Sequence, residues 1–425
     1  HRDLHLSLRR QRQMCIRDSF CCGGRITMNM PHRLNREWVH HAMTTGRCMA
    51  RVLIVGGGLA GLSAALEATT AGHHVVALER ASRIGGRGTS QALDGFSIGY
   101  GPHFLMKNGP LHSIAKRLSR VRLAASPLRP HRTEILGHGP IRPTGDLRQA
   151  ALNKRALKAN DMTHPIVQGA HFLANWGATD NGRVQALNKS QLLVSNEGWN
   201  GLVGRMAAAL DEVGVFIECG LDVTQIEQGK VHLSDGRTIE TDVIVLACGA
   251  KAARRLLLPL DQSETEAQFN QLERTTASTI EVGLAAQPFG EHHAVVDLER
   301  QMALIDYINI QPKLGPHGSH LAAIAVGGLP RDAGPNRFEA VEDRMLALEA
   351  FMDERALGWR NHVVQEGRQP NITVLEATHT KMDPLAFKHL GIVLAGSWVE
   401  SDHMLADGAV SSGRKAGRLI AKIAP

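Results

Sequence analysis

The chain has 425 residues, 43% of them hydrophobic, so it can bury a large core and is long enough for two closely packed domains. No apolar run reaches the roughly 20 residues that a membrane-spanning helix needs, so the sequence does not predict an integral membrane protein. The formal charge of +7 is not accompanied by aromatic residues among the cations, which argues against nucleic-acid binding.

Much of the positive charge lies in residues 116–158, where Lys and Arg far outnumber Asp and Glu. Such a segment can face an anionic membrane, or it can be an ordinary solvated surface. Both interpretations stay open, so peripheral membrane association is one of two expectations.

Residues 1–48 do not look like part of a fold. They are rich in Arg and His and lack hydrophobic periodicity, and residues 13–19 resemble the translation of a transposase adapter used in sequencing libraries. We expect a non-native or disordered segment, with Met49 as the natural start. The alternative is an Arg-rich transit peptide.

The cysteines give no metal or disulfide signature. After residue 48 the chain keeps Cys219 and Cys248, and neither lies in a CxxC or Cys/His cluster. This pattern favours a reducing cytoplasm. We expect no metal site.

Residues 51–61, RVLIVGGGLAG, combine a buried strand with a phosphate-binding turn. In a GxGxxG turn the first glycine permits the bend, the second lets the backbone approach a pyrophosphate, and the third lets the helix pack on the strand. The amides at the start of that helix favour negative charge. The predicted cofactor contacts here are Gly56, Gly58, Leu59, Ala60 and Gly61.

A second strand, residues 74–78, ends in Glu79. An acid about 20 residues after the glycines commonly accepts hydrogen bonds from the adenosine ribose. Strand, glycines, helix, strand and acid in this order predict a bound dinucleotide.

The next residues depart from a nicotinamide dehydrogenase. Arg80 is followed by Gly85, Gly86 and Arg87, and this ER-x(4)-GGR arrangement resembles the flavin-dependent amine oxidase superfamily, which includes protoporphyrinogen oxidases and phytoene-desaturase-like enzymes. The resemblance implies that Gly86 lies close to the cofactor and that the arginines approach its phosphates. A planar guanidinium suits that contact.

Residues 96–104, FSIGYGPHF, resemble the family segment beside the isoalloxazine ring, in the form of the carotenoid-desaturase branch. The resemblance implies cofactor contacts at Gly101 and Pro102. His103 is a weak catalytic candidate as an acid or base, and the alternative is a histidine that only hydrogen-bonds the cofactor or the backbone.

Two later segments extend the resemblance. Val223 stands where the family places a valine whose backbone pairs with adenine, and residues 241–247 resemble the strand that returns to the nucleotide domain. Residues 391–398 and the start of the last helix resemble the family's C-terminal flavin segment. The implied contacts there are Ser397, Asp407, Gly408 and Ala409. The family has an acid at the position of Ser397.

These patterns predict an α/β fold, a Rossmann-type FAD-binding domain (GR2-like) with an inserted α+β substrate domain. The FAD-binding domain is expected to comprise residues 49–105, 196–255 and 385–425, and the substrate domain residues 106–195 and 256–384.

The resemblance implies an oxidoreductase with noncovalent FAD that moves a hydride from an activated C–H bond to flavin N5, with oxygen or a quinone as electron acceptor. An aromatic content of 4% disfavours the aromatic cage of amine oxidases, so we expect an apolar, desaturase-like small-molecule substrate. Two alternatives stay open: a non-catalytic binding protein resembling Rab GDP-dissociation inhibitors, and a nicotinamide-dependent dehydrogenase.

Overall fold

The computed structural model describes residues 50–424 except 119–121, 177–180, 328–339 and 378–379. The expectations for residues 1–48 and for Met49 lie outside the described residues.

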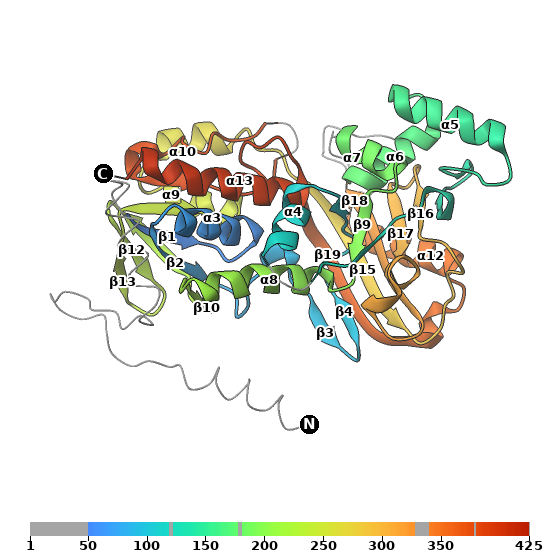
Figure 1. The fold of residues 1–425 in the computed structure, drawn as a ribbon, viewed down its shortest axis with the longest axis horizontal. Coiled ribbons are helices and arrows are strands. Elements are labelled where there is room, and N and C mark those ends of the chain that lie inside the picture. The colour runs from blue at the N-terminus through green and yellow to red at the C-terminus, as the bar shows by residue number, and fades with distance from the viewer. Residues whose placement is uncertain (1–49, 119–121, 177–180, 328–339, 378–379, 425) are drawn as a thin grey trace. The chain divides into compact units, whose positions relative to one another are not determined.

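A five-stranded parallel sheet forms around the predicted first strand (Figure 1). Its order is β10 (Phe216–Cys219), β2 (His74–Glu79), β1 (Arg51–Val55), β14 (Val243–Leu246) and β20 (Ile392–Leu394). Because every pair is parallel, all five strands end at the same edge. Dinucleotides bind outside this carboxyl edge in open α/β sheets.

Both faces of the parallel sheet are covered, which explains why β1 is almost wholly apolar. Val52 and Ile54 pack toward α3 (Leu59–Thr70), α8 (Gly198–Glu212) and α13 (Leu405–Leu419). Leu53 and Val55 pack on the opposite side. That side is formed by β11 (Val223–Glu227), β12 (Lys230–Leu233), β13 (Thr238–Glu240), α9 (Ala250–Leu257) and α10 (Gln262–Phe269).

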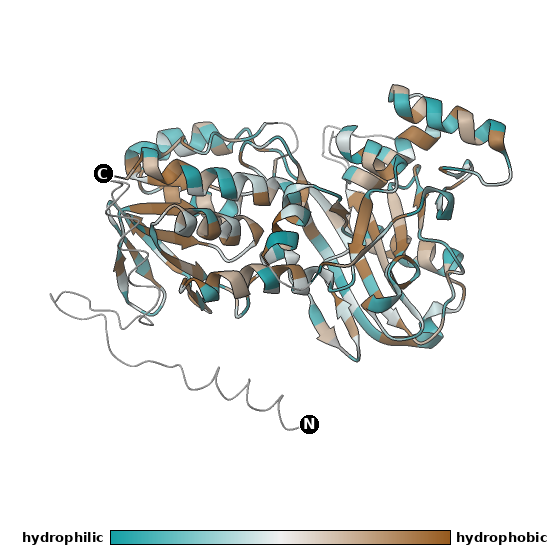
Figure 2. Cartoon of the chain, viewed as in Figure 1, coloured by the Kyte–Doolittle hydropathy of each residue, from teal (hydrophilic) through white to brown (hydrophobic). Residues whose placement is uncertain are grey.

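A second, seven-stranded sheet is mostly antiparallel, and Figure 2 shows hydrophobic residues concentrated along its strands. Its order is β19 (Val363–Leu375), β15 (Thr275–Leu284), β18 (Ser319–Gly327), β17 (Met302–Asp306), β16 (Ala294–Asp297), β7 (Thr133–Ile135) and β8 (Gly139–Pro140). One face packs against α6 (Pro165–Asn175) and α7 (Asn181–Asn188), beside α5 (Leu147–Ala159). The other face packs against α12 (Val341–Arg355).

Short elements connect the two sheets. They are β3 (Gln91–Leu93), β4 (Phe96–Ile98), β5 (Leu105–Met106), α4 (Pro110–Arg117), β6 (Ala125–Pro127), β9 (Leu192–Ser195) and α11 (Tyr307–Ile310). No helix within the described ranges is long and apolar enough to cross a membrane.

The predicted α/β class with a Rossmann-type parallel sheet is confirmed. The division into an FAD-binding and a substrate domain stays a proposal. Ala377 and Met382 lie in the core beside the parallel sheet, so we propose that the last FAD-binding segment begins before residue 385.

Candidate functional site

The glycine turn lies at the carboxyl end of β1 and is closely packed. A Cβ on Gly56, which has a φ of +114°, would lie 2.5 Å from the carbonyl oxygen of Ala247, and one on Gly61 would lie 1.8 Å from that of Gly56. Gly58 differs, because the nearest atoms to its Cβ position are 3.9 Å away. The turn therefore leaves open the side of Gly58, where a pyrophosphate is expected.

Helix α3 begins directly at this turn. Gly58 is its N-cap and makes no side-chain hydrogen bond, so the first-turn amides are left for an anion. Leu59 and Ala60 are buried, and their backbone amides belong to this first turn.

Glu79 ends β2 beside the same turn. Its Oε2 accepts a hydrogen bond from the amide of Gly57 at 2.7 Å, and its Oε1 accepts one from the amide of Ala81 at 2.8 Å. The carboxylate is thus held at the sheet edge, where it can also accept ribose hydroxyls.

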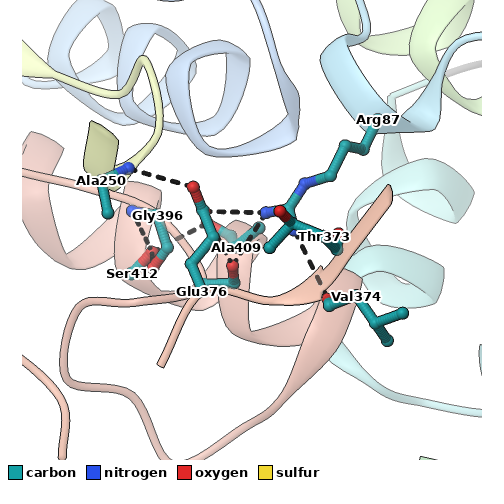
Figure 3. Close-up of polar contacts among 9 residues, drawn as sticks. Arg87, Ala250, Thr373, Val374, Glu376, Gly396, Ala409 and Ser412 are labelled. Carbon is teal, nitrogen blue, oxygen red and sulfur yellow. Dashed lines mark hydrogen bonds and ion pairs between the residues drawn. The ribbon is translucent and has the colours of Figure 1, made fainter. Parts of the chain in front are cut away.

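Arg87 and Ser397 meet across the sheet edge, whereas Arg80 is simply exposed. The Arg87 guanidinium donates to Ser397 Oγ at 2.9 Å and to Glu376 Oε2 at 2.9 Å, as Figure 3 shows for Arg87 and Glu376. Gly86, with a φ of +55°, brings its backbone against Gly58. Glu376 is a member of this cluster that the sequence analysis missed.

The segment expected beside the flavin ring is packed against the second sheet. Gly101 and Pro102 are buried, and the amide of Gly101 donates to Glu281 Oε2 at 3.1 Å. His103 Nδ1 lies 2.8 Å from the carbonyl oxygen of Gly101, which can only accept, so Nδ1 carries the proton. Burial lowers the pKa of His103 to about 4, and the ring is therefore neutral at pH 7.

Glu281 and His320 form a buried pair beside His103. They project from β15 and β18, and His320 Nε2 lies 2.9 Å from Glu281 Oε1, with side-chain exposures of 1% and 2% respectively. The edge-on ring of Tyr307, 5.1 Å away, holds the imidazole in place. His320 Nδ1 is buried and has no hydrogen-bond partner within the described part of the chain.

A cavity of about 20 Å³ adjoins this cluster. Its walls include His103, Glu281, His320 and Tyr307, together with apolar side chains such as Trp199 and Leu314. The volume suits one water molecule or one small polar group. Because burial raises the pKa of Tyr307 well above its ordinary value, its hydroxyl stays protonated.

The remaining predicted residues lie in two other places. Val223 is buried, and its carbonyl oxygen accepts from Arg255 at 2.9 Å. Asp407 is buried near the start of α13 and pairs with Arg183 at 3.4 Å. Gly408 is packed against the carbonyl oxygen of His403, and the carbonyl oxygen of Ala409 accepts from Ser412. The structure thus brings the Asp407 carboxylate to Arg183, not to the glycine turn.

The sheet edge fits a dinucleotide, since it offers an open glycine, a helix N-terminus and two carboxylates that can accept hydroxyl groups. A family model described as FAD dependent oxidoreductase matches residues 51–355. The chain belongs to the FAD-dependent oxidoreductase family. It is an FAD-binding enzyme. The predicted resemblance to flavin-dependent amine oxidases is confirmed as far as membership of the FAD-dependent oxidoreductase family.

Solved structures of low sequence identity share the fold of this FAD-dependent oxidoreductase. An oxidoreductase from Methanosarcina mazei has a TM-score of 0.65 at 16% identity, over 86% of this chain and 99% of that one. Cyclohexylamine oxidase from Brevibacterium oxydans has a TM-score of 0.59 at 15% identity, over 88% and 99%.

A local match joins the chain to a curated relative. It is 42% identical over 55 residues to 4,4'-diapolycopene oxygenase from Methylomonas sp, covering 13% of this chain. The match spans 11% of that relative's length, so the relative's activity does not transfer to this chain.

Proposed function

We propose that this FAD-dependent oxidoreductase removes a hydride from a C–H bond that is allylic or adjacent to nitrogen, in an apolar small molecule. The observation that carries the proposal is the buried Glu281–His320 pair, which lies beside the segment expected at the flavin ring. The local match to a diapolycopene oxygenase supports the apolar substrate.

Bound FAD would accept the hydride, and residues 96–104 are proposed to lie beside its ring. Forming the new double bond also releases a proton from the substrate atom next to the oxidised carbon. His320 is proposed to accept that proton at Nδ1, because Glu281 accepts a hydrogen bond from Nε2–H and leaves the Nδ1 lone pair open.

His103 is less suited to this step. Its Nδ1–H is engaged by the carbonyl oxygen of Gly101, and the amide of His103 donates to the hydroxyl of Tyr307 at 2.8 Å. These bonds favour the interpretation of His103 as a residue that holds backbone near the cofactor.

The first test is the absorption spectrum of the purified protein, followed by anaerobic bleaching with amines, carotenoid precursors and porphyrinogens. We expect a flavin band, acid-released FAD because the cofactor is noncovalent, and bleaching by an apolar compound. A colourless protein that cannot be reconstituted with FAD would contradict the enzyme assignment and favour a non-catalytic binding protein.

His320→Gln tests the proton acceptor. We expect unchanged FAD content and a rate of flavin reduction lower by about 10²- to 10⁴-fold, the usual contribution of a general base. The matched control is His293→Gln, since His293 is also a buried histidine but does not line the cavity. Equal reduction rates in wild type and His320→Gln would reject the role.

Oxygen or a quinone is the proposed electron acceptor, and the cytoplasm is the proposed location.

Peripheral contact with an anionic membrane is proposed at α5. Leu147 and Leu152 there are 82% and 48% exposed, among exposed cations. An exposed apolar residue among basic residues suits an anionic lipid surface.

Vesicle sedimentation tests the α5 contact. We expect binding to vesicles that contain phosphatidylserine and weaker binding for Leu147→Ser. Leu346→Ser is the control, because Leu346 is 66% exposed on α12, which carries acidic residues in its first turn. Equal binding by both variants and the wild type would reject α5 as the contact.

A further inference from the structure

Glu376 brings a carboxylate to the carboxyl edge of the parallel sheet from the end of a strand in the other sheet. It follows β19 directly, and its side chain is 16% exposed. Its Oε1 accepts a hydrogen bond from the amide of Ala250 at 3.0 Å, and its Oε2 accepts one from the Arg87 guanidinium at 2.9 Å (Figure 3). Oε2 also accepts one from the Ser397 hydroxyl at 3.4 Å.

The backbone around Glu376 is shaped to admit the carboxylate. Gly249 has a φ of +84°, and a Cβ there would lie 2.9 Å from Glu376 Oε1. Glu79 has a matching arrangement on the other flank, where a Cβ on Gly57 would lie 3.3 Å from its Oε2. In both cases a carboxylate lies against a glycine and accepts a backbone amide.

The two carboxylates flank the phosphate turn. In the strand order, Glu79 ends β2 on one side of β1, while Glu376 reaches the turns that follow β14 and β20 on the other side. A dinucleotide lying across this edge has its pyrophosphate at the turn, with one hydroxylated part on each side.

The chemistry of Glu376 selects the part of the cofactor that it can contact. A carboxylate repels phosphate oxygens but accepts hydrogen bonds from hydroxyl groups, and Arg87 offsets its charge. We infer that Glu376 is a cofactor-binding residue whose carboxylate accepts hydroxyls of the ribityl chain of FAD. It thereby supplies, from β19, the carboxylate that is absent at Ser397. The inference rests on the FAD-binding assignment.

The competing explanation is that Glu376 only ties Arg87 to the protein. Arg87 is 47% exposed in this pair, and half-exposed ion pairs add little to stability, so Glu376→Gln is expected to fold. If the Arg87–Glu376 ion pair only positions Arg87 for the phosphates, loss of Glu376 should weaken the binding of every ligand with a pyrophosphate. If Glu376 contacts the ribityl chain, its loss should weaken the binding of FAD and not of ADP.

The experiment titrates the apoprotein with FAD and, separately, with ADP. We expect Glu376→Gln to weaken FAD binding by about 10- to 100-fold, as for the loss of a hydrogen bond to a charged group, and to leave ADP binding unchanged. Adding Ser397→Asp to Glu376→Gln should restore most of the FAD affinity. Glu366→Gln, an exposed acid on the same strand, is the control.

Each outcome is decisive. FAD affinity unchanged in Glu376→Gln, FAD and ADP weakened equally, or no recovery with Ser397→Asp would overturn the inference. A wild-type chain that binds ADP but not FAD would instead contradict the FAD-binding assignment. Thermal unfolding of each apoprotein separates loss of the fold from loss of binding.

Discussion

Replacement of Gly58 by valine separates cofactor binding from folding. The backbone of Gly58 has φ −77° and ψ −179°, an extended conformation that any residue adopts. Its Cβ position has 3.9 Å to the nearest atoms, an ordinary van der Waals distance. We therefore expect Gly58→Val to change the free energy of unfolding by no more than about 1 kcal/mol, the size of an N-cap substitution.

FAD binding should respond very differently. A side chain at Gly58 would occupy the space beside the α3 amides where the pyrophosphate is expected. Losing two charge-assisted hydrogen bonds of about 1.5–3 kcal/mol each weakens binding by roughly 10²- to 10⁴-fold. The assay is a fluorescence titration of apoprotein with FAD, paired with urea unfolding.

Two other glycines provide matched controls. Gly61→Ala places a Cβ 1.8 Å from the carbonyl oxygen of Gly56, so we expect a loss of roughly 3 kcal/mol or more in unfolding free energy. Gly204→Ala, in the exposed part of α8 with nothing within 4 Å, should add about 0.5–1 kcal/mol and leave FAD affinity unchanged. Unchanged FAD affinity in Gly58→Val would refute the placement of the pyrophosphate.

Two further predictions concern stability. Burial beside Arg132 and Arg129 lowers the pKa of His293 to about 4 from its ordinary value of 6.5, so the unfolded state binds more protons between these values. The free energy of unfolding should fall as pH drops from 6.5 to 4, by at most roughly 3 kcal/mol from this residue, and His293→Gln should flatten the urea-unfolding profile; equal slopes in both proteins would refute this. Asp407→Asn should cost about 1.5–3 kcal/mol in urea unfolding, because it removes the charge from the buried carboxylate that pairs with Arg183, and an unchanged free energy of unfolding would refute it.

Local chemistry explains how far the sequence could predict the fold. The apolar run before Gly56 and the one before Glu79 became β1 and β2, with bounds within one residue of those expected. These strands are predictable because their apolar pattern and the glycines of the adjoining turn lie within a few residues of each other in the sequence. The buried strand β14, Val243–Leu246, likewise lies within the expected residues 241–247.

The catalytic candidates depended on strand pairing that no local pattern specifies. Glu281 and His320 are 39 positions apart and meet because β15 pairs with β18. A charged residue within the apolar run of β15 was a usable signal, since a carboxylate is seldom buried without a partner. The identity of that partner required the register.

Glu376 carried a local signal of the same kind as Glu79. Both acids directly follow a leucine at the end of a strand: Glu79 follows Leu78 as the last residue of β2, and Glu376 follows Leu375, the last residue of β19. The sequence pattern places residues 256–384 in the substrate domain, so Glu376 was not compared with Glu79. That placement follows from β19, which pairs within the seven-stranded sheet through almost its whole length. The chain leaves that sheet at Glu376 and only there meets Ala250 and Ser397. An acid at the end of a strand is therefore informative about the sheet edge that it reaches, and that edge need not belong to the strand's own sheet.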